Sequence, residues 1–162
     1  MSNMFVRRAE PAVLRWAAEA ICWLARIGLA FTFWLSGQTK IEGLVLDPLA
    51  LQVRWGWPRI SESALELFRS EYALPLLPPE WAALLAASAE HVLPLLLLLG
   101  LGTRLAALGI LGMTLVIQLF VYPLAFPTHA LWAAAALYLL ANGGGRVALD
   151  RLLADRFGRE GA

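Results

Sequence analysis

Residues 105–141 contain no aspartate, glutamate, lysine or arginine. One membrane crossing takes about 20 residues, so this stretch is too long for one crossing helix and long enough for two. Pro123 and Pro127 lie near its middle, where the chain should turn back. The stretch therefore predicts two crossings, over about residues 105–122 and 128–142, and the second can be extended by the apolar residues before it.

Two further apolar runs, residues 16–36 and 81–101, have the length of crossing helices. Apolar residues make up 60% of the sequence, against about 45–50% in an average soluble domain. A cleaved signal peptide is the alternative for the first run, but Glu19 and Arg26 lie inside it, and signal sequences keep their apolar core free of charge. The sequence predicts an all-α fold, an integral membrane four-helix bundle forming a single domain over residues 1–162.

The basic residues predict how this bundle is oriented, because cytoplasmic segments are richer in Lys and Arg. With four crossings, one side carries Arg7, Arg8, Arg15, Arg104, Arg146, Arg151, Arg156 and Arg159. The other side carries the long loop 37–80, where four basic residues are mixed with six acidic ones. We expect both termini in the cytoplasm, the loop outside, and the chain in a bacterial inner (plasma) membrane.

Short helices are predicted outside the crossings. Ser61 is a suitable N-cap for a helix over SESALELFRSEY in the loop. The tail segment VALDRLLADRF separates apolar from charged residues, which suits a helix on the cytoplasmic membrane surface, although a frayed tail is the alternative. The net charge of +1, spread along the chain, gives no basic patch for nucleic acid.

Arg26 and Glu90 lie near the middle of the first and second predicted crossings. Each charge alone would cost about 2.5–3.5 kcal/mol at that depth. Pairing removes much of this cost, so the sequence predicts a buried Arg26–Glu90 ion pair between these helices. The pair either fixes the register of the helices or lines a polar cavity for a proton, an ion or a headgroup.

A second group of polar and aromatic residues lies toward the non-cytoplasmic end of the predicted bundle. Its members are Lys40, Gln118, Tyr122, His129 and Trp132. Their side chains can hydrogen-bond carbonyl oxygens, and Trp34 and Trp132 could flank a flat ring. The group suits a quinone headgroup, and it equally suits a belt of interfacial residues that only anchors the bundle.

Metal and covalent cofactor sites are not predicted. The single cysteine, Cys22, cannot form a disulfide or a thiolate metal site within the chain. His91 and His129 lie at different predicted depths, which disfavours a haem held by both. His91 is better explained as a contact between helices. A quinone is the one cofactor for which the sequence offers candidate residues.

Several segments resemble the DoxX family of bacterial membrane proteins. They are Arg26 with the SGxxK of Ser36, Gly37 and Lys40, then LFRSEYALPLLPPEWAA, then AEHVLPLLLLLGLGTRLAALGILGMTLVIQLFVYP, and finally PTHALWAA and GGGRVALDRLL. The resemblance implies four inner-membrane helices. The family is named for its similarity to a subunit of an archaeal thiosulfate:quinone oxidoreductase, and other members are linked to membrane redox complexes.

The first functional hypothesis is therefore an accessory or membrane-anchor subunit of a redox or respiratory complex that contributes to a quinone site. Its partners would be the lipid bilayer and a second membrane protein or another copy of the chain. A self-sufficient quinone-dependent oxidoreductase is the first alternative. A small transporter-like module is the second, although the sequence shows no inverted repeat.

Overall fold

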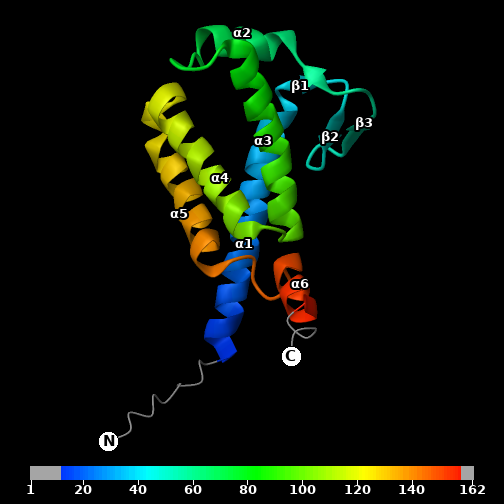
Figure 1. Cartoon of the computed structure of the whole chain (residues 1–162), viewed down its shortest axis with the longest axis vertical. Helices are drawn as coiled ribbons and strands as arrows, with labels where there is room; N and C mark the ends of the chain where they lie inside the picture. Colours follow the sequence, from blue (N-terminus) through cyan, green and yellow to red (C-terminus); the bar gives the residue numbers. More distant parts are fainter. Residues whose placement is uncertain (1–11, 158–162) are drawn as a thin grey trace, which may run out of the picture.

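Long apolar helices form a bundle in the computed structural model, which describes residues 12–157 (Figure 1). Within this range four helical segments are long and apolar enough to cross a membrane. They are α1 (Ala12–Gln38), α3 (Pro79–Leu99), α4 (Thr103–Val116) with the π-helical turn η1 (Ile117–Val121), and the 3₁₀ turn η2 (Pro123–Ala125) with α5 (Phe126–Asn142). The predicted all-α membrane bundle is confirmed.

The boundary between the last two crossings lies at Tyr122, six residues before the predicted start of the fourth crossing. Pro123 begins the η2 turn, and Pro127 lies in the first turn of α5. Proline fits both positions, because the backbone N–H groups of the first helical residues have no carbonyl acceptor in a preceding turn, so that the missing N–H of proline costs no hydrogen bond. The apolar residues before Thr128 thus complete the fourth crossing.

Small side chains let the crossing helices approach one another. α1 packs mainly against α3, and α4 packs mainly against α5, with further contacts between α3 and α4 and between α1 and α5. The buried core contains many alanines, such as Ala30, Ala83, Ala107 and Ala136. Because lipid and Leu are equally apolar, close packing of small residues is what favours helix association in a membrane.

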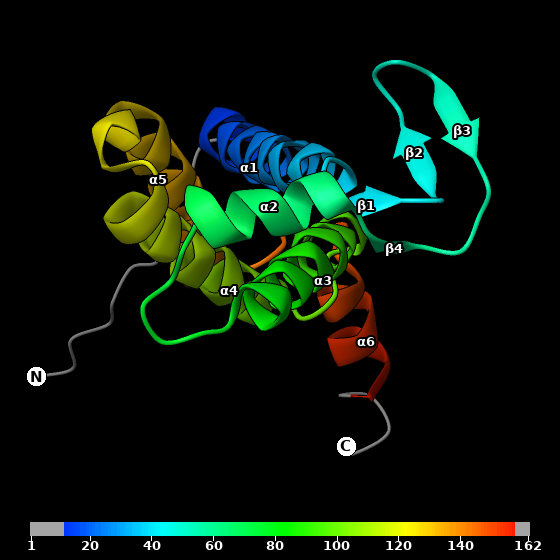
Figure 2. The ribbon, with the colours of Figure 1, turned by 90° about the horizontal axis from the view of Figure 1, so that it is seen from above.

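One end of the bundle, here called the α2 end, carries the loop between α1 and α3. Strands β1 (Ile41–Glu42) and β4 (Arg59–Ile60) pair antiparallel, as do β2 (Val45–Asp47) and β3 (Gln52–Arg54). Helix α2 (Glu62–Ser70) lies across the end of the bundle, and the β2–β3 hairpin projects to one side (Figure 2). The sequence prediction omitted these strands, which have only two or three residues each.

Helix α2 begins where the sequence predicted. The Ser61 hydroxyl oxygen accepts a hydrogen bond from the Ala64 backbone N–H at 3.2 Å. Ala64 and Phe68 are buried, and Phe68 packs beside Ala82 and Ala83 at the start of α3. The amphipathic helix is therefore fixed against the bundle.

The opposite end, here called the α6 end, carries the start of α1 and helix α6 (Leu149–Phe157) (Figure 1). The tail helix is confirmed as a helix, and its position on a membrane surface stays a prediction. The orientation also stays a prediction, which labelling of cysteines at each end with an impermeant reagent would test. Arg7, Arg8 and Arg159, which entered that prediction, lie outside the described residues.

Asp150 of α6 caps the N-terminus of α4. Gly102 occupies the cap position and has no side chain. The Asp150 carboxylate instead accepts hydrogen bonds from the backbone N–H groups of Gly102 at 2.7 Å and Thr103 at 2.9 Å. Burial alone would raise the pKa of Asp150, but these two donors outweigh it and hold the pKa below its ordinary value.

We expect this cap to be sensitive to pH. A lowered pKa in the folded state means that the stabilisation is complete above the unfolded-state pKa, about 3.9, and is lost as the pH falls through the folded-state pKa. Asp150→Asn should lower the free energy of unfolding by about 1 kcal/mol at pH 7, and by less in acid. Denaturation in detergent at pH 7 and pH 3 would measure this, with exposed Asp155→Asn as control. An equal loss at both pH values would contradict it.

Candidate functional site

The structure separates the two charges that the sequence predicted to pair. Arg26 is buried, and its guanidinium donates hydrogen bonds to the carbonyl oxygens of Leu97 and Leu98 at 2.7 Å and of Gly144 at 2.8 Å. The prediction of an Arg26–Glu90 ion pair is therefore wrong. Arg26 lies level with the end of α3, seven residues beyond Glu90, which is about 10 Å along a helix.

The carboxylate of Glu90 pairs with Lys40 instead. The Lys40 Nζ lies 2.7 Å from Glu90 Oε2 and donates a hydrogen bond to Oε1 at 3.0 Å. The Ser36 hydroxyl also donates to Oε1 at 3.0 Å. The side chains of Lys40 and Glu90 are only 11% and 4% exposed, so the ion pair is largely removed from solvent.

Close contact between α1 and α3 makes this ion pair possible. A Cβ on Gly37 would lie 2.8 Å from the His91 ring and 3.0 Å from the Glu90 Cβ. His91 is held by Gln38, whose Nε2 lies 2.9 Å from His91 Nε2, and by the Ala87 carbonyl at 2.7 Å from Nδ1. The prediction that His91 is a contact between helices is confirmed.

His129 is held in place from the π-helical turn. Its Nδ1 lies 2.7 Å from the Gln118 Oε1, and the Gln118 Nε2 donates to the Pro123 carbonyl oxygen at 2.7 Å. His129 is buried and its ring lies 5.0 Å from that of Trp132, which in turn contacts Phe33 edge-on. Such π-helical turns often occur at functional sites.

Tyr72 and Tyr122 connect the segment after α2 to the end of the π-helical turn. Their hydroxyl oxygens are 2.8 Å apart, and their rings meet edge-on. Burial, followed by the hydrogen bond to Tyr122, raises the pKa of Tyr72 well above its ordinary value. Tyr72 therefore stays a neutral hydroxyl at physiological pH.

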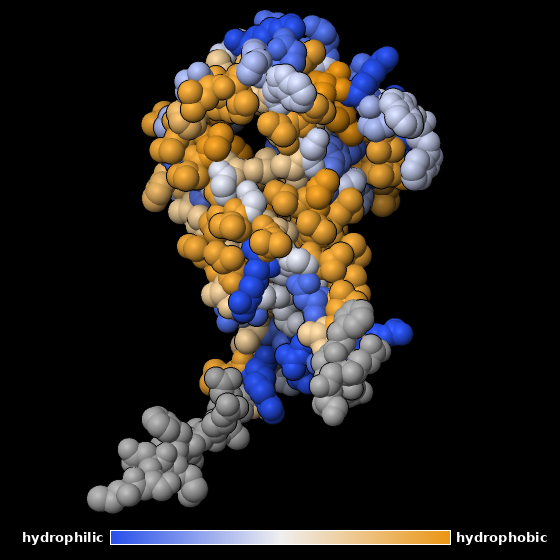
Figure 3. Space-filling view, viewed as in Figure 1, coloured by the Kyte–Doolittle hydropathy of each residue, from blue (hydrophilic) through white to orange (hydrophobic). Residues whose placement is uncertain are grey.

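These groups surround one cavity of about 440 Å³ at the α2 end. Figure 3 shows it as a hollow in the apolar face between α3 and α4, beneath α2. Its polar lining consists of Ser36, Lys40, Tyr72, Glu90, Tyr122 and His129, and Trp132 lines it too. Apolar and small residues of α3, α4 and the α2 segment form the rest of the wall, including Ala86, Ala89, Gly109, Gly112 and Met113.

The structure thus brings most of the predicted site residues together. Lys40, Tyr122, His129 and Trp132 line the same cavity, and Gln118 orients His129 from behind. Trp34 has another role, because its indole N–H donates to the Leu46 carbonyl at 2.7 Å and its ring packs edge-on against His91. It therefore anchors the β2–β3 hairpin.

The sequence analysis missed two of the polar residues in the cavity wall. Ser36 was noted only as part of a motif, although its place four residues before Lys40 puts both on one face of a helix. Tyr72 lies in the loop, and no local signal indicated that the chain returns over the bundle at that point. Over residues 12–157, no group of three His, Cys, Asp or Glu side chains is placed to hold a metal ion.

A protein-family model described as DoxX matches residues 21–123, which is more than half of the chain. The chain belongs to the DoxX family. No curated protein and no solved structure is similar enough to match it. The matched segment of this DoxX protein includes Lys40 and Glu90 and ends just after Tyr122. His129, on the α5 side of the cavity, follows the matched segment.

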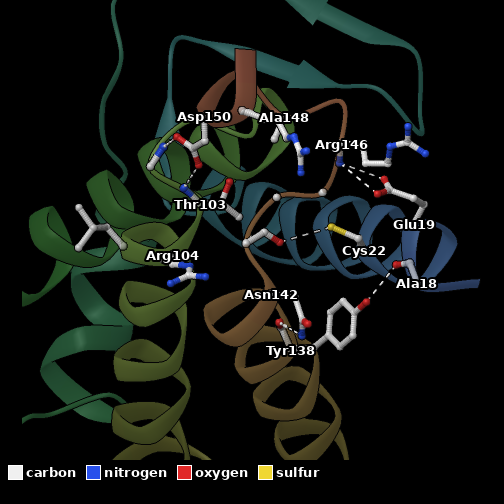
Figure 4. Close-up of a pocket in the computed structure, with 16 residues that line it drawn as sticks. Ala18, Glu19, Cys22, Thr103, Arg104, Tyr138, Asn142, Arg146, Ala148 and Asp150 are labelled. Carbon is white, nitrogen blue, oxygen red and sulfur yellow. Dashed lines mark hydrogen bonds between the residues drawn. The ribbon is translucent and has the colours of Figure 1, made fainter. Parts of the chain in front are cut away.

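A second pocket, of about 530 Å³, lies at the α6 end of this DoxX protein (Figure 4). Its polar groups are largely joined to one another. The Glu19 carboxylate accepts from the Arg146 backbone N–H, the Cys22 thiol lies 3.5 Å from the Gly143 carbonyl oxygen, and the Tyr138 hydroxyl donates to the Ala18 carbonyl oxygen at 3.0 Å. These contacts tie α1 to α5 and to the loop before α6.

Proposed function

We propose that this DoxX protein binds a lipid-soluble quinone in the cavity between α3 and α4, as an accessory subunit of a membrane redox complex. The single observation that carries the proposal is the composition of the cavity wall. Apolar residues line most of it, and a few polar groups converge at the α2 end. Sites for small apolar ligands have this composition, and their volumes run from about 300 to 1,000 Å³.

The polar end suits a ring that carries oxygen atoms. The Lys40 ammonium donates to Ser36 and Glu90, which uses its N–H groups. The hydroxyls of Tyr72 and Tyr122 share one hydrogen bond, so the pair keeps one hydroxyl hydrogen that can be donated to a ligand oxygen. Trp132 supplies an aromatic surface beside His129, at a ring distance of 5.0 Å. A flat ring can pack against such a surface, with its oxygen atoms toward the polar side chains.

The apolar part of the wall suits the tail of such a ligand. Gly109 and Gly112 lie on the face of α4 that lines the cavity, and Ala86 and Ala89 lie opposite on α3. Within the described residues, a Cβ built on Gly112 would meet no atom within 4 Å apart from its chain neighbours and the backbone of its own helix. The groove therefore has room for a flexible apolar chain at membrane depth. The accessory role rests on membership of the DoxX family, which is named for its similarity to a subunit of a thiosulfate:quinone oxidoreductase.

Filling the groove is expected to weaken binding. Gly112→Leu adds a branched side chain at a position in the cavity wall where the Cβ has open space, and it raises the helix propensity of α4. We expect the protein to stay folded and its affinity for a short-tailed quinone to fall about tenfold or more. A tenfold loss of affinity corresponds to about 1.4 kcal/mol of binding free energy. Titration of the protein in lipid nanodiscs, followed by tryptophan fluorescence, would measure the dissociation constant.

Gly28→Leu is the matched control. Gly28 is also a helical glycine with open space around its Cβ position, but it lies on the exposed face of α1, away from the cavity. It should bind quinone as the unmodified protein does. Equal affinity in both variants, or no saturable binding by the unmodified protein, would contradict the quinone site. Isolation of the chain without any redox partner from native membranes would count against the accessory role.

A further inference from the structure

The hydrogen bonds around Gln118 fix the orientation of its amide group. The Pro123 backbone oxygen can only accept a hydrogen bond, so the group 2.7 Å from it must be the Gln118 Nε2. The Gln118 Oε1 therefore faces His129. The two ends of the amide cannot be exchanged without placing two oxygen atoms against each other.

This orientation in turn fixes the proton on the imidazole. The Gln118 Oε1 only accepts, so the His129 Nδ1, at 2.7 Å, must carry a hydrogen and donate it. In a neutral imidazole the other nitrogen, Nε2, then has a free lone pair. Because Nδ1 is used by Gln118 and His129 lines the cavity, Nε2 is the nitrogen left for a ligand.

A lone pair distinguishes the two redox forms of a quinone ring. The oxidised form presents two carbonyl oxygens, which only accept hydrogen bonds. The reduced form, the quinol, presents two hydroxyl groups, each of which can donate. An oxygen acceptor placed against the His129 lone pair would leave both groups unsatisfied in a site of low exposure, which is unfavourable. The carboxylate of Glu90 adds a second acceptor to the same cavity.

We propose that the cavity binds the quinol in preference to the quinone, with a quinol hydroxyl donating to the His129 Nε2. This inference rests on the proposed function, because it concerns the ligand of the same cavity. Gln118 is a positioning residue in this arrangement, since it acts on the ligand only through the tautomer of His129. Lys40 already donates to Ser36 and Glu90. The Tyr72–Tyr122 pair uses one hydroxyl hydrogen between its members and keeps one, which can be donated to the oxygen of either form, so the discrimination arises at His129.

The test compares the affinities of the two redox forms. Short-tailed quinone and its quinol are titrated anaerobically into the protein in nanodiscs, and the ratio of the two dissociation constants is the readout. We expect the unmodified protein to bind the quinol about tenfold more tightly. In Gln118→Leu, His129 can carry its hydrogen on either nitrogen, so the ratio should fall toward one while quinone still binds.

Gln38→Leu is the matched control, because it removes a similar glutamine–histidine contact, to His91, away from the cavity wall. Its affinity ratio should equal that of the unmodified protein. ¹⁵N NMR of histidine-labelled protein gives a direct second readout, with a hydrogen expected on Nδ1 and a free lone pair on Nε2 of His129.

The outcomes separate this inference from the proposed function. Binding of the quinone as tightly as the quinol, or more tightly, would overturn the inference and leave the quinone site standing. A hydrogen on His129 Nε2 in the NMR spectrum would overturn it as well. A ratio unchanged by Gln118→Leu would remove the positioning role of Gln118. If neither form binds, the proposed function itself fails.

Discussion

Replacement of Arg26 by methionine is expected to lower the free energy of unfolding by about 3 kcal/mol or more. The guanidinium of this buried residue satisfies three carbonyl oxygens at once, two from the end of α3 and one from Gly144 before α6. Each hydrogen bond to a charged group contributes about 1.5–3 kcal/mol, and each buried carbonyl left without a donor carries a further penalty. Methionine preserves most of the side-chain volume and none of these bonds.

Unfolding of the purified protein by SDS in mixed micelles would measure this loss. Arg15→Met is the control, because Arg15 lies on the same helix and is exposed. Arg26→Lys should recover part of the stability, since one ammonium group cannot reproduce the planar fork of donors. An exposed ion pair contributes less than about 1 kcal/mol to stability. If Arg26→Met lowered the free energy of unfolding by no more than that, the three carbonyl oxygens would have found other donors, and the expectation would be wrong.

Removal of Lys40 alone should destabilise the protein by about 3–5 kcal/mol, because it leaves the carboxylate of Glu90 buried without a counter-charge. The double variant Lys40→Met with Glu90→Leu should recover most of the loss. Apolar groups that replace both partners of a buried pair often leave stability unchanged. The same SDS unfolding experiment would compare the single and double variants.

The exposed pair of Arg59 and Glu42 provides the matched control. Its atoms are 2.8 Å apart, yet the two side chains are 75% and 48% exposed. Arg59→Met should therefore cost less than about 1 kcal/mol. If the double variant at Lys40 and Glu90 were as unstable as Lys40→Met, the loss would come from packing, and the unpaired charge would not explain it.

The crossing helices could be predicted from sequence because a membrane imposes a simple requirement. A helix must present about 20 apolar residues, and residues 105–141 can meet that only by turning back once. The boundary near Tyr122 was harder to predict, because both sides of it are apolar. Only the two prolines mark it, and each fits more than one position at the start of a helix.

The pairing of charges could not be predicted by counting residues. Arg26 and Glu90 were placed at equal depth by their distance from the ends of their apolar runs. The structure sets Arg26 against the last turn of α3 and places Gly37 beside Glu90. Lys40 lies fourteen residues, or almost four helical turns, beyond Arg26 on the chain, and the observed register brings it to Glu90 in place of Arg26.

The cavity wall could be predicted only where its residues are neighbours on one helix. Residues four apart on one helix are neighbours, so Gln118 and Tyr122 could be grouped from sequence. Tyr72 comes close to Tyr122 only because α2 packs across the end of the bundle. The contact between Gln118 and His129 requires the turn of residues 117–125, whose geometry no local pattern specifies.

The hollow between α3 and α4 opens on the apolar face of the bundle, where acyl chains would lie against the protein. In a membrane such a groove would be filled by lipid whenever its ligand is absent. The occupancy of the site would then depend on the mole fraction of ligand in the bilayer and on how readily it displaces a lipid tail. Affinities measured in detergent and in bilayers should differ accordingly, and lipid composition would act as a competitor.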